Sequence, residues 1–187
     1  MKKLVLRAGF PEHTFMIIVY TGNGKGKTTA ALGQAVRALG ENKKVIMIQF
    51  IKGPWMSGED TFARKFQNPK SKFQIIKGGK GFVGILGDKL PRSVHKKAAM
   101  AALKLAKKII LGKKYDLVIL DEINVAVGLK LVSEEDVLKI LKKIPQEVNI
   151  ILTGRGAPKK FVDLAEIATE MKEIKYDFRP VKQGLEY

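Results

Sequence analysis

The stretch that decides the fold is Val19-Tyr20-Thr21-Gly22-Asn23-Gly24-Lys25-Gly26-Lys27-Thr28-Thr29. An apolar run precedes it, so we expect a short buried strand over residues 15–21. A helical pattern follows over residues 27–39. A glycine-rich turn between a strand and a Gly-Lys-Thr helix start predicts a phosphate-binding loop. Glycines let backbone N–H groups point at an anion, and the helix start adds N–H groups and the positive end of its dipole.

The spacing of this loop differs from the usual pattern of a glycine, four residues and Gly-Lys-Ser/Thr. Thr21 holds the place of the first glycine, Gly22 lies one residue late, and Gly24 adds a glycine inside the loop. We still expect Lys27 to reach the terminal phosphates and the Thr28 hydroxyl to hold Mg²⁺. A turn that binds nothing is the alternative, but the strand, loop and helix signals agree. The spacing indicates an unusual placement of the nucleotide.

The 187 residues predict one domain over residues 15–187, with an N-terminal extension over residues 1–14. Hydrophobic residues make up 45% of the chain, which is enough for a core. We find no secretion signal, and no apolar run approaches the roughly 18 residues of a membrane span, so we expect a cytoplasmic protein. The chain has no cysteine, which excludes disulfides and thiolate metal sites.

The chain carries a formal charge of +17, from 35 basic and 18 acidic residues. Such an excess attracts polyanions, including nucleic acid, anionic membranes and phosphorylated ligands. The lysines occur as scattered pairs, such as Lys43-Lys44 and Lys107-Lys108, and are not massed with aromatic residues. This favours a solvated basic surface over a nucleic-acid-binding module, whose binding would depend strongly on salt.

Strands and helices alternate along the rest of the chain. We expect strands at Val45–Phe50, Phe73–Lys77, Leu117–Glu122, Asn149–Thr153 and Thr169–Ile174. We expect helices at Glu59–Phe66, Pro91–Leu111, from Ser133 to Pro145, and at Lys159–Ile167. This alternation predicts an α/β fold with a doubly wound, mostly parallel sheet. With the phosphate-binding loop, the expected class is the three-layer RecA-like sandwich of P-loop NTPases. His95, near the start of the long helix, is expected to be solvated and is assigned no chemistry.

Candidate site residues fall at the carboxyl ends of the expected strands, the edge at which open α/β sheets bind ligands. Asp121 and Glu122 end the fourth strand. Paired with Lys27 and Thr28, they predict the acidic element that holds the phosphate-bound Mg²⁺. Arg155 follows the fifth strand in a Gly-Arg-Gly turn, where it either touches phosphate or lies on the surface.

Two aromatic side chains belong to loops at the same edge. Trp55, the only tryptophan, follows the second strand and is either an anchor on the core or a wall of the ligand pocket. Phe82 is surrounded by five glycines in the segment 78–87, which predicts a mobile loop that covers a ligand. The alternative is that Phe82 pins the loop to the core.

Together these motifs resemble the P-loop type of ATP:corrinoid adenosyltransferases, also called cob(I)alamin adenosyltransferases. The matching segments run in order along the chain and are Tyr20–Ala31, Arg37–Gly40, Gln49–Gly53, Leu117–Glu122, Ile151–Gly156 and Gln183–Tyr187. Thr21 in place of a glycine is itself a trait of that family, in which ATP lies reversed compared with ordinary P-loop enzymes.

The resemblance implies transfer of the 5′-deoxyadenosyl group of ATP to the Co(I) centre of a reduced corrinoid, with triphosphate as the leaving group. Because Co(I) is the nucleophile, no Ser, Cys or His nucleophile is required. The enzyme positions two ligands and stabilises a highly charged leaving group. The resemblance also implies Mg²⁺ or Mn²⁺, an electron-donating reductase or flavodoxin, and a homodimer.

The resemblance and the motifs together assign roles to individual residues. Catalysis is assigned to Lys27, Thr28 and Glu122, and metal binding to Thr28, Glu122 and Asp121. Nucleotide contacts are assigned to Gly22, Asn23, Gly24, Lys25, Gly26, Lys27, Thr28, Thr29, Arg37 and Arg155. Corrinoid binding is assigned to Phe82 and Trp55.

The corrinoid side departs from the family pattern. The family has a Gly-Phe-x-Trp segment whose aromatic residues help to displace the lower axial ligand of the corrinoid. Here the segment reads Gly81-Phe82-Val83-Gly84, with Gly84 in the place of the tryptophan. Either Phe82 acts with another side chain, or the preferred corrinoid differs, or reduction is less well assisted. We predict that Phe82 packs against the corrin or its lower face.

A generic ATPase of the same fold is the main alternative. In that enzyme Glu122 would activate water, and the products would be ADP and phosphate. The departure at Thr21 and the closing Gln183–Tyr187 segment argue against it.

Overall fold

The computed structural model describes residues 15–65, 72–85, 87–177 and 182–184. The expected extension over residues 1–14 and most of the Gln183–Tyr187 segment lie outside the described residues. In chain order, the elements are β1 (Ile17–Thr21), α1 (Lys27–Gly40), β2 (Val45–Gln49), α2 (Gly58–Lys65), β3 (Phe73–Lys77), α3 (Arg92–Leu111), β4 (Leu117–Asp121), α4 (Ile123–Gly128), α5 (Glu134–Leu141), β5 (Asn149–Thr153), α6 (Lys159–Leu164) and β6 (Ile167–Glu170).

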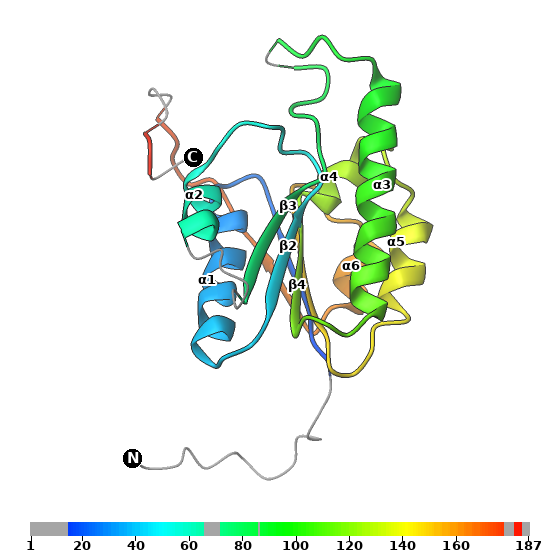
Figure 1. The fold of residues 1–187 in the computed structure, drawn as a ribbon. Coiled ribbons are helices and arrows are strands. Elements are labelled where there is room, and N and C mark those ends of the chain that lie inside the picture. Colours follow the sequence, from blue (N-terminus) through cyan, green and yellow to red (C-terminus); the bar gives the residue numbers. More distant parts are fainter. Residues whose placement is uncertain (1–14, 66–71, 86, 178–181, 185–187) are drawn as a thin grey trace.

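The described strands form one sheet in the order β3-β2-β4-β5-β1-β6, and each neighbouring pair is parallel. Helices α1 and α2 cover one face, and α3, α4, α5 and α6 cover the other (Figure 1). The predicted α/β sandwich of three layers is therefore confirmed. Interior strands β2 and β4 are buried at every residue, as expected for continuous apolar runs between two helical layers.

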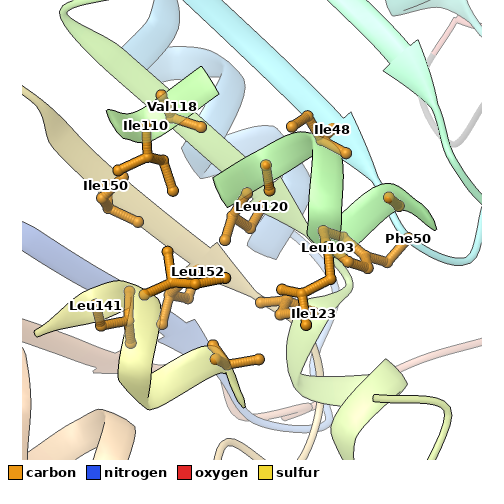
Figure 2. Close-up of a cluster of buried hydrophobic side chains, with 14 of the residues drawn as sticks. Ile48, Phe50, Leu103, Ile110, Val118, Leu120, Ile123, Leu141, Ile150 and Leu152 are labelled. Carbon is orange, nitrogen blue, oxygen red and sulfur yellow. The ribbon is translucent and has the colours of Figure 1, made fainter. Parts of the chain in front are cut away.

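Alternating strand residues point into two apolar clusters. On the α1 face, Met47, Ile119 and Ile151 share a cluster with Ala31 and Ala35, whose small side chains allow close packing. The second cluster lies beneath α3, α4 and α5. Figure 2 labels the following members of it: Ile48, Phe50, Leu103, Ile110, Val118, Leu120, Ile123, Leu141, Ile150 and Leu152. Both clusters hold the strand ends, and so the site, in fixed register.

Helix α3 confirms its prediction at both ends, with Pro91 at the N-cap and Gly112 at the C-cap. His95, in contrast, is only 3% exposed, so the expectation of a solvated histidine was wrong. Its side chain faces the preceding loop and pairs with Asp88. Across the described part of the chain, no helix has both the length and the apolar character needed to cross a membrane.

Three predicted elements in the C-terminal half have different bounds in the structure. Helix α5 starts at its Ser133 cap as predicted but ends at Leu141, before Pro145 is reached. Helix α6 ends at Leu164 because Ala165 is already extended (φ −82°, ψ 141°). Strand β6 then pairs with β1 from Ile167 onward, earlier than expected. All four residues of β6 are exposed, so this edge strand has no alternating burial that its sequence pattern could reveal.

Candidate active site

The phosphate-binding loop closes around its own lysine. Lys27 is 7% exposed, and its Nζ donates hydrogen bonds to the carbonyl oxygens of Gly22 (2.8 Å) and Gly24 (2.6 Å). Gly26 adopts a φ of +105°, which turns the chain into α1. Burial lowers the pKa of Lys27, while the nearby Glu122 carboxylate opposes this shift. The loop therefore holds a cation next to the unpaired N–H groups that begin a helix.

The extra glycines of the loop face the chain segment that follows β6. The N–H of Gly24 donates to the carbonyl of Met171 at 2.8 Å. A Cβ on Gly22 would lie 2.4 Å from the Met171 oxygen, and one on Gly24 would lie 2.7 Å from the carbonyl carbon of Lys172. The unusual glycine spacing is thus required by packing on the outer side of the loop, in addition to any role toward phosphate.

Thr21 has its own partner across the sheet. Its hydroxyl accepts a hydrogen bond from the N–H of Ala157 at 3.0 Å. This bond joins the start of the phosphate-binding loop to the Gly-Arg-Gly turn after β5. A glycine at this position would leave that N–H without its acceptor, which gives a physical reason for the threonine.

Polar side chains from three elements meet at Asp121, which has no exposed surface. Its Oδ1 accepts hydrogen bonds from the hydroxyls of Thr28 and Thr153, both at 2.8 Å. The Thr153 hydroxyl in turn accepts from the N–H of Glu122 at 2.9 Å. We call Lys27, Thr28, Asp121, Glu122 and Thr153 the nucleotide cluster. The sequence places Thr153 at the end of a strand and in the Ile151–Gly156 segment, but its contact with Asp121 depends on pairing between β4 and β5.

Three further side chains extend the nucleotide cluster toward β2. Gln49 pairs in register with Asp121, and its Nε2 lies 3.3 Å from both Asp121 Oδ2 and Glu59 Oε1. Lys52 Nζ lies 2.5 Å from Glu59 Oε1 and 3.9 Å from Asp121 Oδ2. Burial by itself lowers the pKa of Lys52, but the neighbouring carboxylates of Asp121 and Glu59 raise it, and the net effect is a raised pKa. Sequence reasoning assigned no site role to Gln49, Lys52 and Glu59, because strand register brings Gln49 to Asp121 and only tertiary packing brings the other two side chains to Gln49 and to each other.

Glu122 occupies an unusual backbone and electrostatic position. Its φ of +61° is in the left-handed region, which is uncommon for a residue with a long side chain. Burial, reinforced by the neighbouring Asp121 charge, raises the pKa of Glu122 to about 7. The turn after β5 needs Gly154, because its φ is +126° and a Cβ there would also lie 3.2 Å from Glu122 Oε2. Backbone strain and a shifted pKa at one residue are features of functional sites.

The oxygen atoms of Thr28, Asp121 and Glu122 form a donor set of the kind that Mg²⁺ and Mn²⁺ prefer. Within the described ranges, no group of three or more His, Cys, Asp or Glu side chains could hold a metal ion by itself. Mg²⁺ usually takes one or two protein carboxylates and completes its shell with phosphates and water. The residues present therefore fit a magnesium ion that is shared with a triphosphate.

The remaining predicted nucleotide residues lie at the rim of the loop. Asn23 and Thr29 are exposed. Lys25 Nζ lies 3.1 Å from the Tyr176 hydroxyl and 4.2 Å from the centre of its ring. Arg155 is exposed, and its charge contributes to the lowered pKa of the buried loop lysine. Arg155 thus acts electrostatically on the centre of the loop.

Arg37 is not brought to this cluster. It lies exposed in the last turn of α1, whereas Lys27 is the first residue of that helix. Ten residues of helix separate them by about 15 Å along the axis. The placement of Arg37 therefore gives no support to the predicted nucleotide contact within one chain.

The two predicted aromatic residues meet each other. The Trp55 and Phe82 rings stack with centroids 6.3 Å apart and planes at 30°. Their exposed fractions are 63% and 46%, so neither is an anchor buried in the core. The loops approach so closely that a Cβ on Gly53 would lie 2.9 Å from the nitrogen of Gly81. We call Trp55 and Phe82 the aromatic pair. Figure 1 shows that their two loops extend from the same edge of the sheet, where β2 and β3 end.

A cavity of about 190 Å³ lies beside the aromatic pair. Apolar Ile85 and Leu90 and basic Lys80 and Lys89 contribute to its lining. Gly84, in the place of the family tryptophan, has a φ of +70°, which side-chain-bearing residues rarely adopt. The ring that stacks on Phe82 is that of Trp55, from the loop after β2.

Comparison with known proteins adds family evidence. The family described as "ATP:corrinoid adenosyltransferase BtuR/CobO/CobP" matches residues 13–187. The chain is 37% identical to the corrinoid adenosyltransferase of Escherichia coli K12 over 164 residues, which covers 87% of this chain and 79% of that protein. It is 35% identical to corrinoid adenosyltransferase CobA of Salmonella typhimurium over 180 residues, which covers 94% and 87% respectively.

Two solved structures share the fold. Flagellar accessory protein FlaH from Methanocaldococcus jannaschii aligns with a TM-score of 0.56 and 15% identity, over 84% of this chain and 71% of that one. A KaiC-like protein from Pyrococcus horikoshii aligns with a TM-score of 0.53 and 20% identity, over 91% and 77%. At such identities the likeness concerns architecture alone, and it confirms the predicted RecA-like fold.

Proposed function

Because this chain belongs to the ATP:corrinoid adenosyltransferase family and is a corrinoid adenosyltransferase, we propose that the nucleotide cluster holds the triphosphate of ATP while the aromatic pair receives the corrinoid. In this reaction Co(I) attacks the 5′ carbon of ATP. A Co–C bond forms, the bond between C5′ and its oxygen breaks, and triphosphate leaves with the bonding electron pair.

The observation that carries the proposal is the continuity between the two halves of the site. The loop after β2 starts beside Asp121, to which Gln49 is hydrogen-bonded. Lys52 lies 3.9 Å from the same carboxylate. Three residues later the loop presents Trp55 to Phe82. One short loop therefore links the proposed phosphate site to the proposed corrinoid surface, as transfer between two substrates requires.

On the nucleotide side, the chain supplies positive charge and fixed geometry. The Lys27 ammonium and the first N–H groups of α1 stabilise the charge that develops on the leaving triphosphate. Asp121 fixes the position of the Thr28 hydroxyl through a hydrogen bond of 2.8 Å, and Asp121 is itself held by a hydrogen bond of 2.8 Å from the Thr153 hydroxyl. Thr28, Asp121 and Glu122 would hold Mg²⁺ or Mn²⁺, which when bound neutralises part of the triphosphate charge.

On the corrinoid side, the chain supplies an exposed aromatic surface. Large flat rings of Trp55 and Phe82 provide apolar area with little conformational freedom to lose when the corrin ring packs on them. Trp55 takes the role of the second aromatic residue, which the family pattern would place at Gly84. Since Co(I) is itself the nucleophile, this surface needs only to orient the corrinoid and exclude water.

The family resemblance is the basis for the remaining proposals. We propose that residues 15–187 act as one catalytic domain and that the protein works as a homodimer in the cytoplasm. A reductase or flavodoxin would deliver the electron that forms Co(I). Nucleic acid is not proposed as a partner, because the lysines are scattered along the sequence in pairs.

The test is an anaerobic assay with ATP, Mg²⁺ and a chemically reduced corrinoid. We expect the absorbance spectrum of the adenosylated corrinoid to appear with one triphosphate released for each product molecule. Release of ADP and phosphate without any corrinoid would instead support the generic ATPase in which Glu122 activates water. Chromatography of the nucleotide products separates the two outcomes.

A further inference from the structure

The loop that carries Phe82 is organised around one carboxylate. Asp88 Oδ2 accepts a hydrogen bond from the N–H of Gly84 at 2.8 Å. The same oxygen lies 3.0 Å from Nε2 of His95. Asp88 Oδ1 accepts from the N–H of Leu90 at 3.0 Å. Backbone N–H groups of Gly84 and Leu90 lower the pKa of Asp88, so it is ionised at neutral pH. Because an ionised carboxylate only accepts, Nε2–H of His95 is the donor in this contact.

His95 connects this loop to the core. The side chains of His95 and Asp88 are only 2% and 8% exposed. His95 belongs to the first turns of α3, whose Ala99 and Ala106 have no exposed surface and pack in the main apolar cluster. Among the described residues no side chain caps the start of α3, where Pro91 is the N-cap, so Asp88 does not serve as the helix cap.

The hydrogen-bonded residues flank the proposed corrinoid surface. Gly84 lies two residues after Phe82. Leu90 and Asp88 itself line the cavity beside the aromatic pair. A shift of the Asp88 carboxylate would therefore move both the Phe82 side of the loop and the opposite wall of the cavity.

We propose that Asp88 and His95 are positioning residues for the corrinoid substrate, holding Phe82 against Trp55 and so fixing the shape of the surface on which the corrin ring packs. This inference rests on the proposed corrinoid site. Neither residue belongs to the nucleotide cluster. Their loss therefore changes the KM for the corrinoid and leaves the KM for ATP as it was.

The experiment compares His95→Leu with His95→Gln. Leucine fills the buried space without a donor, whereas the glutamine amide offers an N–H near the position of Nε2. We expect His95→Leu to raise the KM for the corrinoid about tenfold, the order expected for loss of one hydrogen bond to a charged group. His95→Gln should remain within about twofold of the wild type if the donor is what matters. Asp88→Asn, assayed in parallel, should resemble the leucine variant.

Trp55 provides a second measurement that needs no turnover. As the only tryptophan, it makes fluorescence a direct probe of the aromatic pair. Loss of the Asp88–His95 contact should uncover the ring face that Phe82 covers, so acrylamide quenching increases in His95→Leu but not in His95→Gln. Asp163→Asn serves as the matched control, because this exposed carboxylate pairs with Lys159 on α6, outside both substrate sites.

Different results separate the inference from the proposed function. If the wild type forms adenosylated corrinoid and both His95→Leu and Asp88→Asn keep its corrinoid KM and Trp55 quenching, the inference is wrong. Equal losses in His95→Gln and His95→Leu would also overturn it, because they would indicate packing alone. If the wild type forms no product, the proposed function fails, and quenching in the ligand-free protein still decides the positioning role. Thermal unfolding of each variant identifies any that fail to fold, in which case Asp88→Asn carries the test.

Discussion

Asp121 and Thr153 in the nucleotide cluster have no exposed surface, whereas Trp55 and Phe82 are 63% and 46% exposed. Polar groups removed from water need hydrogen-bond partners, and Asp121 obtains them from α1, β2 and β5. Aromatic rings need none, so two loops that are close together suffice to hold them. The comparison teaches that the polar cluster proposed to hold phosphate is built into the sheet, whereas the aromatic pair proposed to receive the corrinoid lies open on two loops.

The two halves also use glycine differently. Gly22 and Gly24 leave space for the backbone that follows β6. Gly53 and Gly81 leave space for each other and for the Trp55 ring. The first pair secures a loop against another strand end, whereas the second pair brings two loops together. We therefore expect substitutions in the buried half to cause the larger losses.

Lys27→Met should break the buried half and give the largest effect. Loss of the central cation removes charge stabilisation of the leaving triphosphate, so kcat/KM for ATP should fall about 10³-fold while the KM for the corrinoid stays similar. Steady-state rates measured anaerobically give both parameters. Lys159→Met, at an exposed lysine of α6, is the control. Activity within tenfold of the wild type would show that the nucleotide cluster does not hold the triphosphate.

Glu122→Gln should change how the free energy of unfolding depends on pH, which tests the electrostatics of the buried half. Because the pKa of Glu122 is raised from 4.5 to about 7 on folding, the folded protein keeps a proton that the unfolded chain releases. In EDTA without ligands, the free energy of unfolding of the wild type should therefore fall as pH rises from about 4.5 to about 7, by up to about 3 kcal/mol.

In Glu122→Gln this loss should be absent, so the variant gains stability relative to the wild type between pH 5 and pH 8. Urea unfolding at both pH values measures the difference. Glu41→Gln removes the same charge at an exposed residue and should show no such gain. Parallel pH profiles for the wild type and Glu122→Gln would contradict the raised pKa.

Trp55→Ala and Phe82→Ala test whether the exposed half acts as one unit. Each should raise the KM for the corrinoid about tenfold, because about half of a stacked aromatic surface is lost, and should leave the KM for ATP unchanged. The double variant should lose less than the product of the single losses, because the rings contact each other. Val36→Ala, at an exposed apolar residue of α1, is the control. Multiplicative losses would mean that the two rings act independently.

Ser133→Ala should give the smallest effect, since Ser133 belongs to neither the nucleotide cluster nor the aromatic pair. The Ser133 hydroxyl accepts from the N–H of Asp136 at 3.1 Å and caps α5. Its removal should lower the free energy of unfolding by about 1 kcal/mol and leave both KM values unchanged. Chemical denaturation and the same steady-state assay provide the two measurements. A change in either KM would show that α5 is coupled to the site.

The sequence alone determined the strand, phosphate-binding loop and helix around Lys27, the alternation of elements, and the place of Asp121 at a strand end. These features are local, because glycine positions and apolar periodicity constrain the backbone within a few residues. Parallel strands then bring their carboxyl ends to one edge, so Lys27 and Asp121 were correctly expected in one region.

Only the tertiary structure decided which side chains become partners. Gln49 and Thr153 reach Asp121 because β2 and β5 flank β4 in a particular register. Trp55 stacks on Phe82 because two loops approach closely. His95 is buried where the loop before α3 brings Asp88 into contact with its ring. Spacing along the chain constrains each backbone segment by itself, whereas contacts between distant segments depend on strand order and packing, which no local pattern contains.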